Sequence, residues 1–197
     1  MPKVFAGNYA DIFDIKGKKA VVVGGAGGFG KEIAKAFAQR GVDVLISSRR
    51  EDALKAACED IKAGAAAGVK VTYFAGDAGD EETVKKMVEF TVSPEGLGGV
   101  DILVNSQGYN KKMWSWEIDT KVWNGMLNTN ITSLMFTCKY FGNWMKEHNT
   151  EDGVVADPST FEAGKATPCA GYGKIINVSS VRGKIATRAP GNAAYCS

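Results

Sequence analysis

This sequence of 197 residues contains one histidine, His148. One imidazole cannot form a zinc site that needs two histidines from the same chain, and a serine–histidine–aspartate triad would have to use His148 alone. His148 follows Lys146-Glu147 where a helix is expected to end, so we predict a solvated surface side chain. Acid–base chemistry in this protein would therefore need another residue type.

The sequence also lacks a cysteine motif, a large net charge and a long apolar run. The spacing of the cysteines fits no zinc or redox motif, which favours free thiols in a cytoplasmic protein. The formal net charge of +2 is too small to indicate nucleic acid or an anionic membrane as a partner. No apolar run approaches the length of a membrane span, and the N-terminus lacks the apolar stretch of a signal peptide. We therefore expect a single cytoplasmic domain over residues 1–197 that binds neither nucleic acid nor membrane.

Strand and helix patterns alternate along the chain. Short apolar strands are predicted at residues 20–23, 42–47, 69–74, 101–105 and 174–179. Helices are predicted after residue 30, over 51–67, behind an N-cap at Asp80, and over 119–147. This alternation predicts an α/β fold with a doubly wound parallel sheet, whose strand carboxyl ends share one ligand-binding edge. Residues 93–99 and 149–173 lack a period and are interpreted as loops, the second as an inserted surface loop.

A glycine-rich loop separates the first strand from the first helix. Glycine permits a positive φ and a close approach by an anion, and the helix behind the loop offers its free N–H groups to that anion. The strand–loop–helix context favours the diphosphate cradle of a Rossmann fold over a merely flexible turn. The cradle is predicted to consist of Gly24, Gly25, Gly27, Gly28, Phe29 and Gly30.

The end of the second strand indicates the type of dinucleotide. An acidic residue there would bind a ribose 2′-hydroxyl, but the sequence has Ser48, Arg49 and Arg50. Two guanidinium groups suit a 2′-phosphate, so NADP(H) is favoured over NAD(H); the alternative is two solvated arginines at a helix start. Asp77, after the third strand, could accept a hydrogen bond from an adenine amino group or could simply form a turn.

Taken in order, these and later motifs resemble the short-chain dehydrogenase/reductase family. Residues 23–30 are similar to its TGxxxGxG loop, with Val23 in place of threonine, and residues 105–108 to its NNAG stretch, with Ser106 and Gln107 in place of asparagine and alanine. Asn130 matches the family's helix asparagine, Ser180 its catalytic serine, and Tyr195 the start of its YxxxK motif. The lysine of that motif would stand at position 199, beyond Ser197.

The resemblance implies hydride transfer between a nicotinamide and a carbonyl or alcohol carbon. It assigns the proton to Tyr195, a hydrogen bond on the reacting oxygen to Ser180, and a relay water to Asn130, and it places Asn105 and Gly108 at the cofactor. It also implies that the last strands of the Rossmann domain are missing from this chain. We therefore expect little dehydrogenase activity from these residues alone, whether they are a fragment or a truncated product.

The expected substrate is a small carbonyl or alcohol compound. Residues 188–195 are similar to family members that act on polyols and sugar acids, so a ketose, polyol or sugar acid is favoured. Several cations on the predicted ligand edge either flank an anionic substrate or form a solvated surface: Lys111, Lys112, Arg182, Lys184 and Arg188. A 3-oxoacyl thioester reductase and a non-catalytic NADP(H)-binding protein are the alternatives, and a homodimer or homotetramer is expected at full length.

Overall fold

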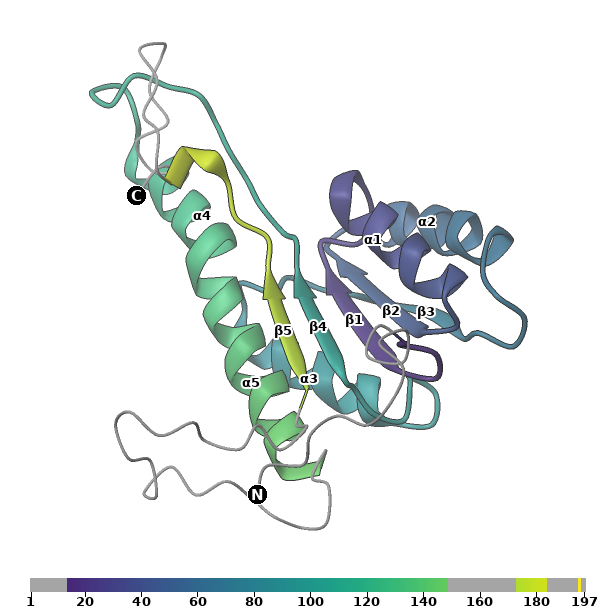
Figure 1. Ribbon diagram of the computed structural model, residues 1–197. Coiled ribbons are helices and arrows are strands. Elements are labelled where there is room, and N and C mark those ends of the chain that lie inside the picture. The colour runs from purple at the N-terminus through teal and green to yellow at the C-terminus, as the bar shows by residue number, and fades with distance from the viewer. Residues whose placement is uncertain (1–13, 149–172, 184–194, 196–197) are drawn as a thin grey trace, which may run out of the picture.

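The computed structural model of the chain describes residues 14–148, 173–183 and 195, and these contain the expected parallel sheet. Its neighbouring strands run in parallel in the order β3-β2-β1-β4-β5 (Figure 1). The reversal of strand order beside β1 is typical of a doubly wound sheet, so the predicted Rossmann-like topology is confirmed. The strands are β1 (Lys19–Val23), β2 (Asp43–Ser48), β3 (Val71–Ala75), β4 (Ile102–Asn105) and β5 (Lys174–Asn177).

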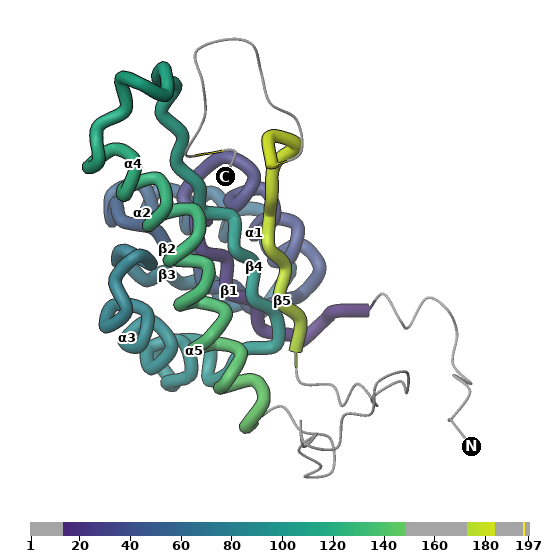
Figure 2. Tube along the Cα trace, turned by 90° about the vertical axis from the view of Figure 1, so that its left-hand side faces the viewer, coloured from purple at the N-terminus to yellow at the C-terminus, as the bar shows by residue number. Residues whose placement is uncertain are grey.

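Helices cover both faces of the sheet. Helices α1 (Gly28–Gln39) and α2 (Glu51–Ala63) lie on one face, and α3 (Glu81–Val92) and α5 (Ser133–His148) on the other (Figures 1 and 2). Because successive strand residues point to opposite faces, Val22 joins the apolar cluster under α1 and α2, while Val21 joins the one under α3 and α5. The continuous β-branched runs of the sequence are thus explained by burial on both sides.

The long helix expected over residues 119–147 is present but is not uniform. Helix α4 (Thr120–Leu127) passes through one wider π-helical turn, Asn128–Thr132, into α5. Asp119 begins α4 by accepting a hydrogen bond from the Val122 N–H at 2.8 Å. The π turn was not foreseen, because the side-chain period of a sequence does not resolve one extra residue in a turn.

Other boundaries agree with the sequence to within a few residues. Asp80 caps α3 as predicted, with its Oδ1 2.7 Å from the Thr83 N–H that donates to it. The helix predicted over 51–67 ends early, at Ala63, where Gly64 follows as the C-cap. His148 is exposed at the end of α5, and its Nδ1 lies 2.9 Å from the Trp144 carbonyl oxygen, as expected for a surface histidine.

The outer side of β5 is open within the described residues. Ile175 and Ile176 are 40% and 48% exposed, although strand residues of this type are usually buried. The predicted loop at 93–99 is present between α3 and β4, whereas the insertion predicted at 149–173 lies outside the described residues except for Gly173. None of the helices in the described part of the chain has both the length and the apolar character needed to cross a membrane.

Candidate functional site

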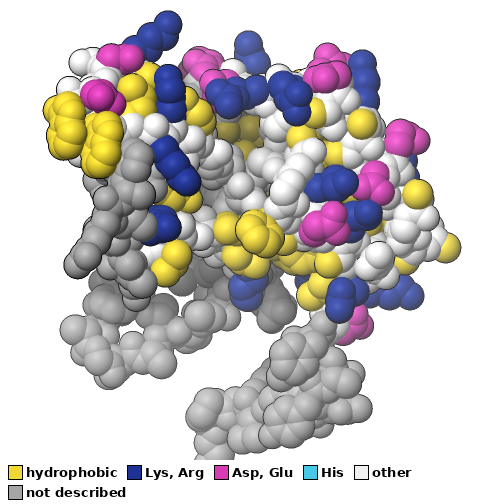
Figure 3. Space-filling model, turned by 90° about the horizontal axis from the view of Figure 1, so that it is seen from above, with side chains coloured by type: hydrophobic (Ala, Val, Ile, Leu, Met, Phe, Trp, Pro, Cys, Tyr) yellow, Lys and Arg dark blue, Asp and Glu magenta, His cyan; other side chains and the backbone are white. Residues whose placement is uncertain are grey.

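A cleft of about 860 Å³ opens at the carboxyl edge of the sheet. Figure 3 looks onto this edge from above and shows the hollow with lysine and arginine side chains around its rim. The volume lies within the range of small-molecule sites, roughly 300–1,000 Å³. Most of the predicted site residues line it, although they come from segments far apart in the sequence: Gly24, Gly27, Gly28, Phe29, Ser48, Arg49, Asp77, Gly108, Asn130, Ser180 and Tyr195.

The glycine turn is held against its neighbours by backbone contacts. The N–H of Gly24 donates to the Ser47 carbonyl at 2.8 Å, and φ of Gly24 is +81°. A Cβ at Gly24 would come within 2.6 Å of the Gln107 backbone nitrogen, and one at Gly30 within 2.4 Å of the Gly24 carbonyl oxygen. These two glycines therefore allow the turn, the loop after β4 and helix α1 to pack closely. Gly25 has a similar packing role and, like Gly30, does not line the cleft.

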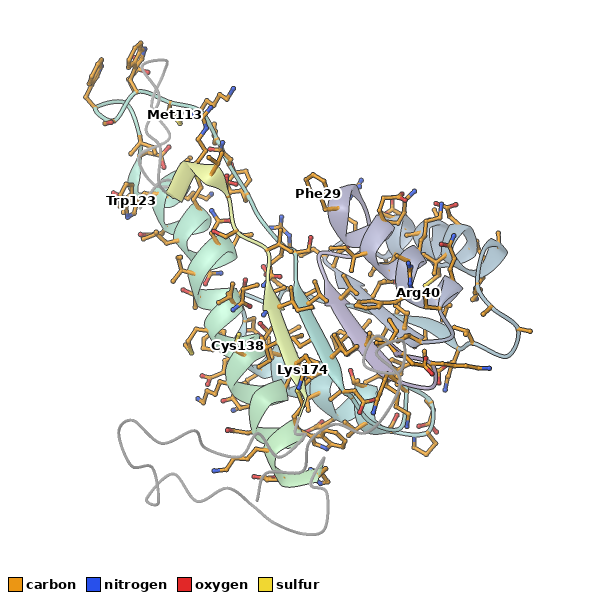
Figure 4. All side chains as sticks on the ribbon, in the orientation of Figure 1. Phe29, Arg40, Met113, Trp123, Cys138 and Lys174 are labelled. Atoms are coloured by element: carbon orange, nitrogen blue, oxygen red, sulfur yellow. The ribbon has the colours of Figure 1, made fainter. Side chains whose placement is uncertain are left out.

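Gly27 and Gly28 face open space instead. A Cβ at either position would find nothing within 4 Å, and both residues line the cleft. Gly27 is the N-cap of α1 and has no side chain that could bond the first helical N–H groups. Phe29 projects from the start of this helix and is 80% exposed (Figure 4). The start of α1 is thus arranged as an uncapped helix end facing a cleft, which fits an anionic group.

A smaller pocket of about 250 Å³ adjoins the cleft at the end of β2. It is lined by Ala26, Gly27, Ser48, Arg49 and Arg50, with no acidic residue among them. Arg50 therefore lies at this side pocket rather than in the main cleft. Lys31 and Lys35 of α1 bond instead to Asp60 of α2, at 2.7 and 2.9 Å, and these hydrogen bonds hold the pKa of the Asp60 carboxyl below its ordinary value. Arg49 and Arg50 are therefore the cations that line this side pocket.

Asp77 forms the turn that the sequence left as one of its two possible roles. Its Oδ1 accepts a hydrogen bond from the Gly79 N–H at 2.9 Å. Asp77 also lines the cleft, where an adenine could bind. Its hydrogen bond with the adenine amino group stays a prediction.

Asn130 lies in the π turn and joins two segments. Its Oδ1 accepts from the Tyr109 N–H at 2.8 Å, and its Nδ2 donates to the Tyr109 carbonyl at 2.9 Å. The side-chain amide thereby ties the helix to the loop after β4, where Tyr109 also lines the cleft. Its predicted role in holding a relay water is not tested by these contacts.

Ser180 and Tyr195 reach the same cleft from the segment that follows β5. Pairing with β4 continues past the strand, since the Val178 N–H donates to the Asn105 carbonyl at 2.9 Å. The Ser180 hydroxyl accepts a hydrogen bond from the Arg182 N–H at 3.2 Å. Fifteen positions further on, Tyr195 also lines the cleft. A phenol, a hydroxyl and an uncapped helix end therefore face one cavity.

Comparison with known proteins agrees with this geometry. The sequence model described as short chain dehydrogenase matches residues 18–197. The chain belongs to the short-chain dehydrogenase family. It is 29% identical over 154 residues to glucose 1-dehydrogenase and 26% identical over 188 residues to gluconate 5-dehydrogenase, both from Gluconobacter oxydans. These alignments cover 78% and 95% of this chain but 56% and 62% of the relatives, so the chain spans about three fifths of their length.

Solved structures of the family have the same fold. A short-chain type dehydrogenase/reductase from Mycobacterium marinum superposes with a TM-score of 0.79 at 24% identity, over 96% of this chain and 66% of that one. A putative short-chain alcohol dehydrogenase from Sinorhizobium meliloti 1021 gives 0.75 at 26% identity, over 94% and 62%. The Rossmann-like fold of this chain is therefore shared with solved members of the family.

Asn105 of the short-chain dehydrogenase pattern also has a packing position, like Gly25 and Gly30. Asn105 is 1% exposed and does not line the cleft. Its Oδ1 accepts from the Thr137 hydroxyl at 2.8 Å, and its Nδ2 donates to Asn177 Oδ1 at 2.9 Å, which joins β4 to α5 and β5. These contacts are structural, and a direct contact between Asn105 and the cofactor stays a prediction.

The cleft also contains residues that sequence reasoning did not assign. These are Tyr109, Ser133 and Asn177. Gln107 lines the cleft as well; for this residue the sequence had left open a contact with the nicotinamide ribose or the substrate, or a side chain in solvent. The sequence could have indicated these residues by their positions just after β4, at the end of β5 and near the π turn. The carboxyl ends of parallel strands meet at one edge of the sheet, where ligands bind. The described cations proposed to flank the substrate, Lys111, Lys112 and Arg182, are not among the lining residues, which favours the solvated interpretation; Lys184 and Arg188 lie outside the described residues.

Proposed function

We propose that the full-length protein is an NADP(H)-dependent dehydrogenase that transfers hydride between the nicotinamide and a carbonyl or alcohol carbon of a ketose, polyol or sugar acid. The observation that carries this proposal is the single cleft that the glycine turn, Ser180 and Tyr195 share. A protein that only bound the dinucleotide would have no chemical use for the serine and tyrosine at that place.

The residues present fit the cofactor. The open positions Gly27 and Gly28, at the uncapped start of α1, suit a diphosphate that needs backbone N–H donors and close approach. Arg49 and Arg50 in the side pocket suit a 2′-phosphate, which accepts paired hydrogen bonds from guanidinium groups. Ser48, Asp77 and Gly108 would border the nucleotide. The bound nicotinamide would supply or accept the hydride.

Tyr195 would give or take the proton on the reacting oxygen, and Ser180 would hold that oxygen by a hydrogen bond. A free tyrosine has a pKa near ~10, so it needs a neighbouring cation to work near neutral pH. The lysine that the family places four residues after the tyrosine could lower that pKa by roughly one to three units. Asn130 would contribute by holding the relay water and, through Tyr109, the loop beside the cleft.

The names of the relatives support the proposed substrate class. Their names point to sugars, sugar acids and polyols: glucose 1-dehydrogenase, gluconate 5-dehydrogenase and galactitol 2-dehydrogenase, the last from Cereibacter sphaeroides and 26% identical over 92% of this chain.

We further propose that the full-length enzyme is a cytoplasmic homodimer or homotetramer. Light scattering of the purified protein tests the assembly, and a monomer at working concentration would contradict it.

The activity is tested by following absorbance at 340 nm while the full-length protein is supplied with NADP⁺ or NADPH and a panel of polyols, ketoses and sugar acids. We expect turnover with members of this panel and a loss of about 10²-fold or more in Tyr195→Phe, since general acid–base catalysis contributes about that much. The variant should still bind NADPH. Turnover of 3-oxoacyl thioesters alone would replace the substrate class, and NADPH binding without any turnover would leave a binding protein.

The cofactor preference is tested with matched arginine variants. Arg49 lies at the side pocket, whereas Arg40 is the C-cap residue at the far end of α1, and Figure 4 shows Arg40 well separated from Phe29 at the other end. We expect Arg49→Ala to weaken NADPH binding about tenfold or more and to leave NADH binding unchanged, because a charge-assisted hydrogen bond is lost only with the 2′-phosphate. Arg40→Ala should bind both dinucleotides as the wild type does. Equal affinity of the wild type for NADH and NADPH would contradict the preference.

A further inference from the structure

Gln107, a residue of the cleft wall, has a buried side-chain oxygen without a hydrogen-bond partner. The residue follows β4, lines the cleft and is partly exposed, but its Oε1 is buried and has no hydrogen-bond partner among the described residues. Its Nε2 donates to the hydroxyl of Ser133 on α5 at 3.0 Å. The amide is therefore satisfied at its nitrogen and unsatisfied at its oxygen.

Neighbouring hydrogen bonds determine which way this amide points. The Ser133 hydroxyl donates its one proton to the Thr129 carbonyl oxygen at 2.6 Å, so towards Gln107 it can only accept. An amide turned around would set two acceptors, Oε1 and the serine oxygen, against each other. The nitrogen of Gln107 consequently faces Ser133, and Oε1 is the atom left without a donor.

A buried amide oxygen without a donor destabilises the folded state, and such atoms are rare in native proteins. The glycine turn shows which ligand group is near. The Gln107 backbone lies directly against Gly24, since a Cβ on Gly24 would come within 2.6 Å of the Gln107 nitrogen. In the proposed function this turn holds the diphosphate, and a ribose with free hydroxyl donors lies on each side of that diphosphate.

We propose that Gln107 Oε1 accepts a hydrogen bond from a ribose hydroxyl of the bound dinucleotide. This inference rests on the proposed function and adds to it a side chain that binds the cofactor by its sugar. Because Gln107 is part of the cleft wall, a small rotation of its side chain would bring Oε1 within reach of a hydroxyl bound in the cleft. Cofactor binding then removes an unfavourable feature of the ligand-free fold.

The test compares Gln107→Met with Ser133→Ala in the full-length protein. Methionine keeps the length of the side chain but has no amide, and Ser133 still has Thr129 as its acceptor. We expect Gln107→Met to leave the ligand-free melting temperature unchanged or higher, because an unsatisfied group is gone, while the Kd for NADPH rises about three- to tenfold. Ser133→Ala keeps Oε1 but leaves Nε2 unpaired, so it should lower the melting temperature and change the Kd less.

Fluorescence titration of NADPH and calorimetric titration of 2′,5′-ADP identify the sugar. Weaker binding of both ligands by Gln107→Met assigns the bond to the adenosine ribose, and weaker binding of NADPH alone assigns it to the nicotinamide ribose. Unchanged Kd values in Gln107→Met would overturn this inference, and the proposed function would still stand as long as the wild type binds NADPH. If Gln107→Met raised the KM for the substrate and left the Kd for NADPH unchanged, the hydrogen bond would be assigned to the substrate instead. Equal losses of stability and affinity in both variants would show a packing role only. A wild-type protein that binds no dinucleotide would overturn both proposals.

Discussion

Substituting alanine for Gly28 separates a requirement of the fold from a requirement of the ligand. Gly28 has φ of +54°, and a Cβ there would meet no protein atom within 4 Å. The only effect on the protein itself is the left-handed backbone, which disfavours a side chain by about 1–2 kcal/mol. Gly68 provides a matched control, because it has φ of +81°, equally open surroundings and a position before β3, away from the cleft. Gly28→Ala and Gly68→Ala should therefore lower the free energy of unfolding by similar amounts.

Their effects on binding should differ. The Cβ of Gly28→Ala would project beside the cleft where a diphosphate must approach the backbone, so we expect the Kd for NADPH to rise about tenfold or more. Gly68→Ala should bind NADPH as the wild type does. Gly24→Ala should behave differently from both, because positive φ and a 2.6 Å approach to backbone add strain and overpacking, roughly 2–5 kcal/mol together.

Urea unfolding followed by circular dichroism gives the stabilities, and quenching or enhancement of NADPH fluorescence gives the affinities. Both are measured on the full-length protein and its three glycine variants. An unchanged NADPH affinity in Gly28→Ala would refute the argument that the start of α1 holds the diphosphate. A Gly24→Ala protein as stable as Gly68→Ala would refute the argument that the turn packs on the loop after β4.

Three further outcomes are expected. Asn105→Ala should lower the free energy of urea unfolding by roughly 1–3 kcal/mol, since it removes the buried hydrogen bonds that join β4 to Thr137 and Asn177; a stability equal to that of the wild type would contradict the structural role. Hydrogen bonds from the side chain and from the backbone N–H of Thr83 lower the pKa of Asp80, so the carboxylate stabilises the fold above its ordinary pKa and loses this effect as the pH falls through the lowered one. The stability difference between the wild type and Asp80→Asn should therefore shrink as the pH is lowered from 6 to about 3, and a constant difference would count against this reasoning. Burial raises the pKa of the Cys58 thiol to about 11, so iodoacetamide near pH 8 should label it only after unfolding, as peptide mass spectrometry would reveal.

The fold was largely predictable because its signals are local. A β-branched run, a glycine turn and a helix with apolar residues on one face identified β1, the loop and α1, and Asp80 marked the start of α3 by its own side chain. Predictions were less accurate where neighbouring segments decide the outcome. The π turn is held by Asn130 bonding the Tyr109 backbone, a contact across 21 positions that no short window of sequence contains.

The same distinction applies to the site. Residue chemistry alone indicated a dinucleotide cradle, an arginine pair suited to phosphate, and the need for a proton carrier other than histidine; the family resemblance then assigned that role to Tyr195. Packing decided which of these residues share a cavity. It brought Tyr195 to the cleft that the glycine turn also lines, set Asn105 in the interior and left the oxygen of Gln107 unpaired. Side-chain type and spacing are carried by the chain, whereas burial and hydrogen-bond partners arise only when distant strands and helices come together.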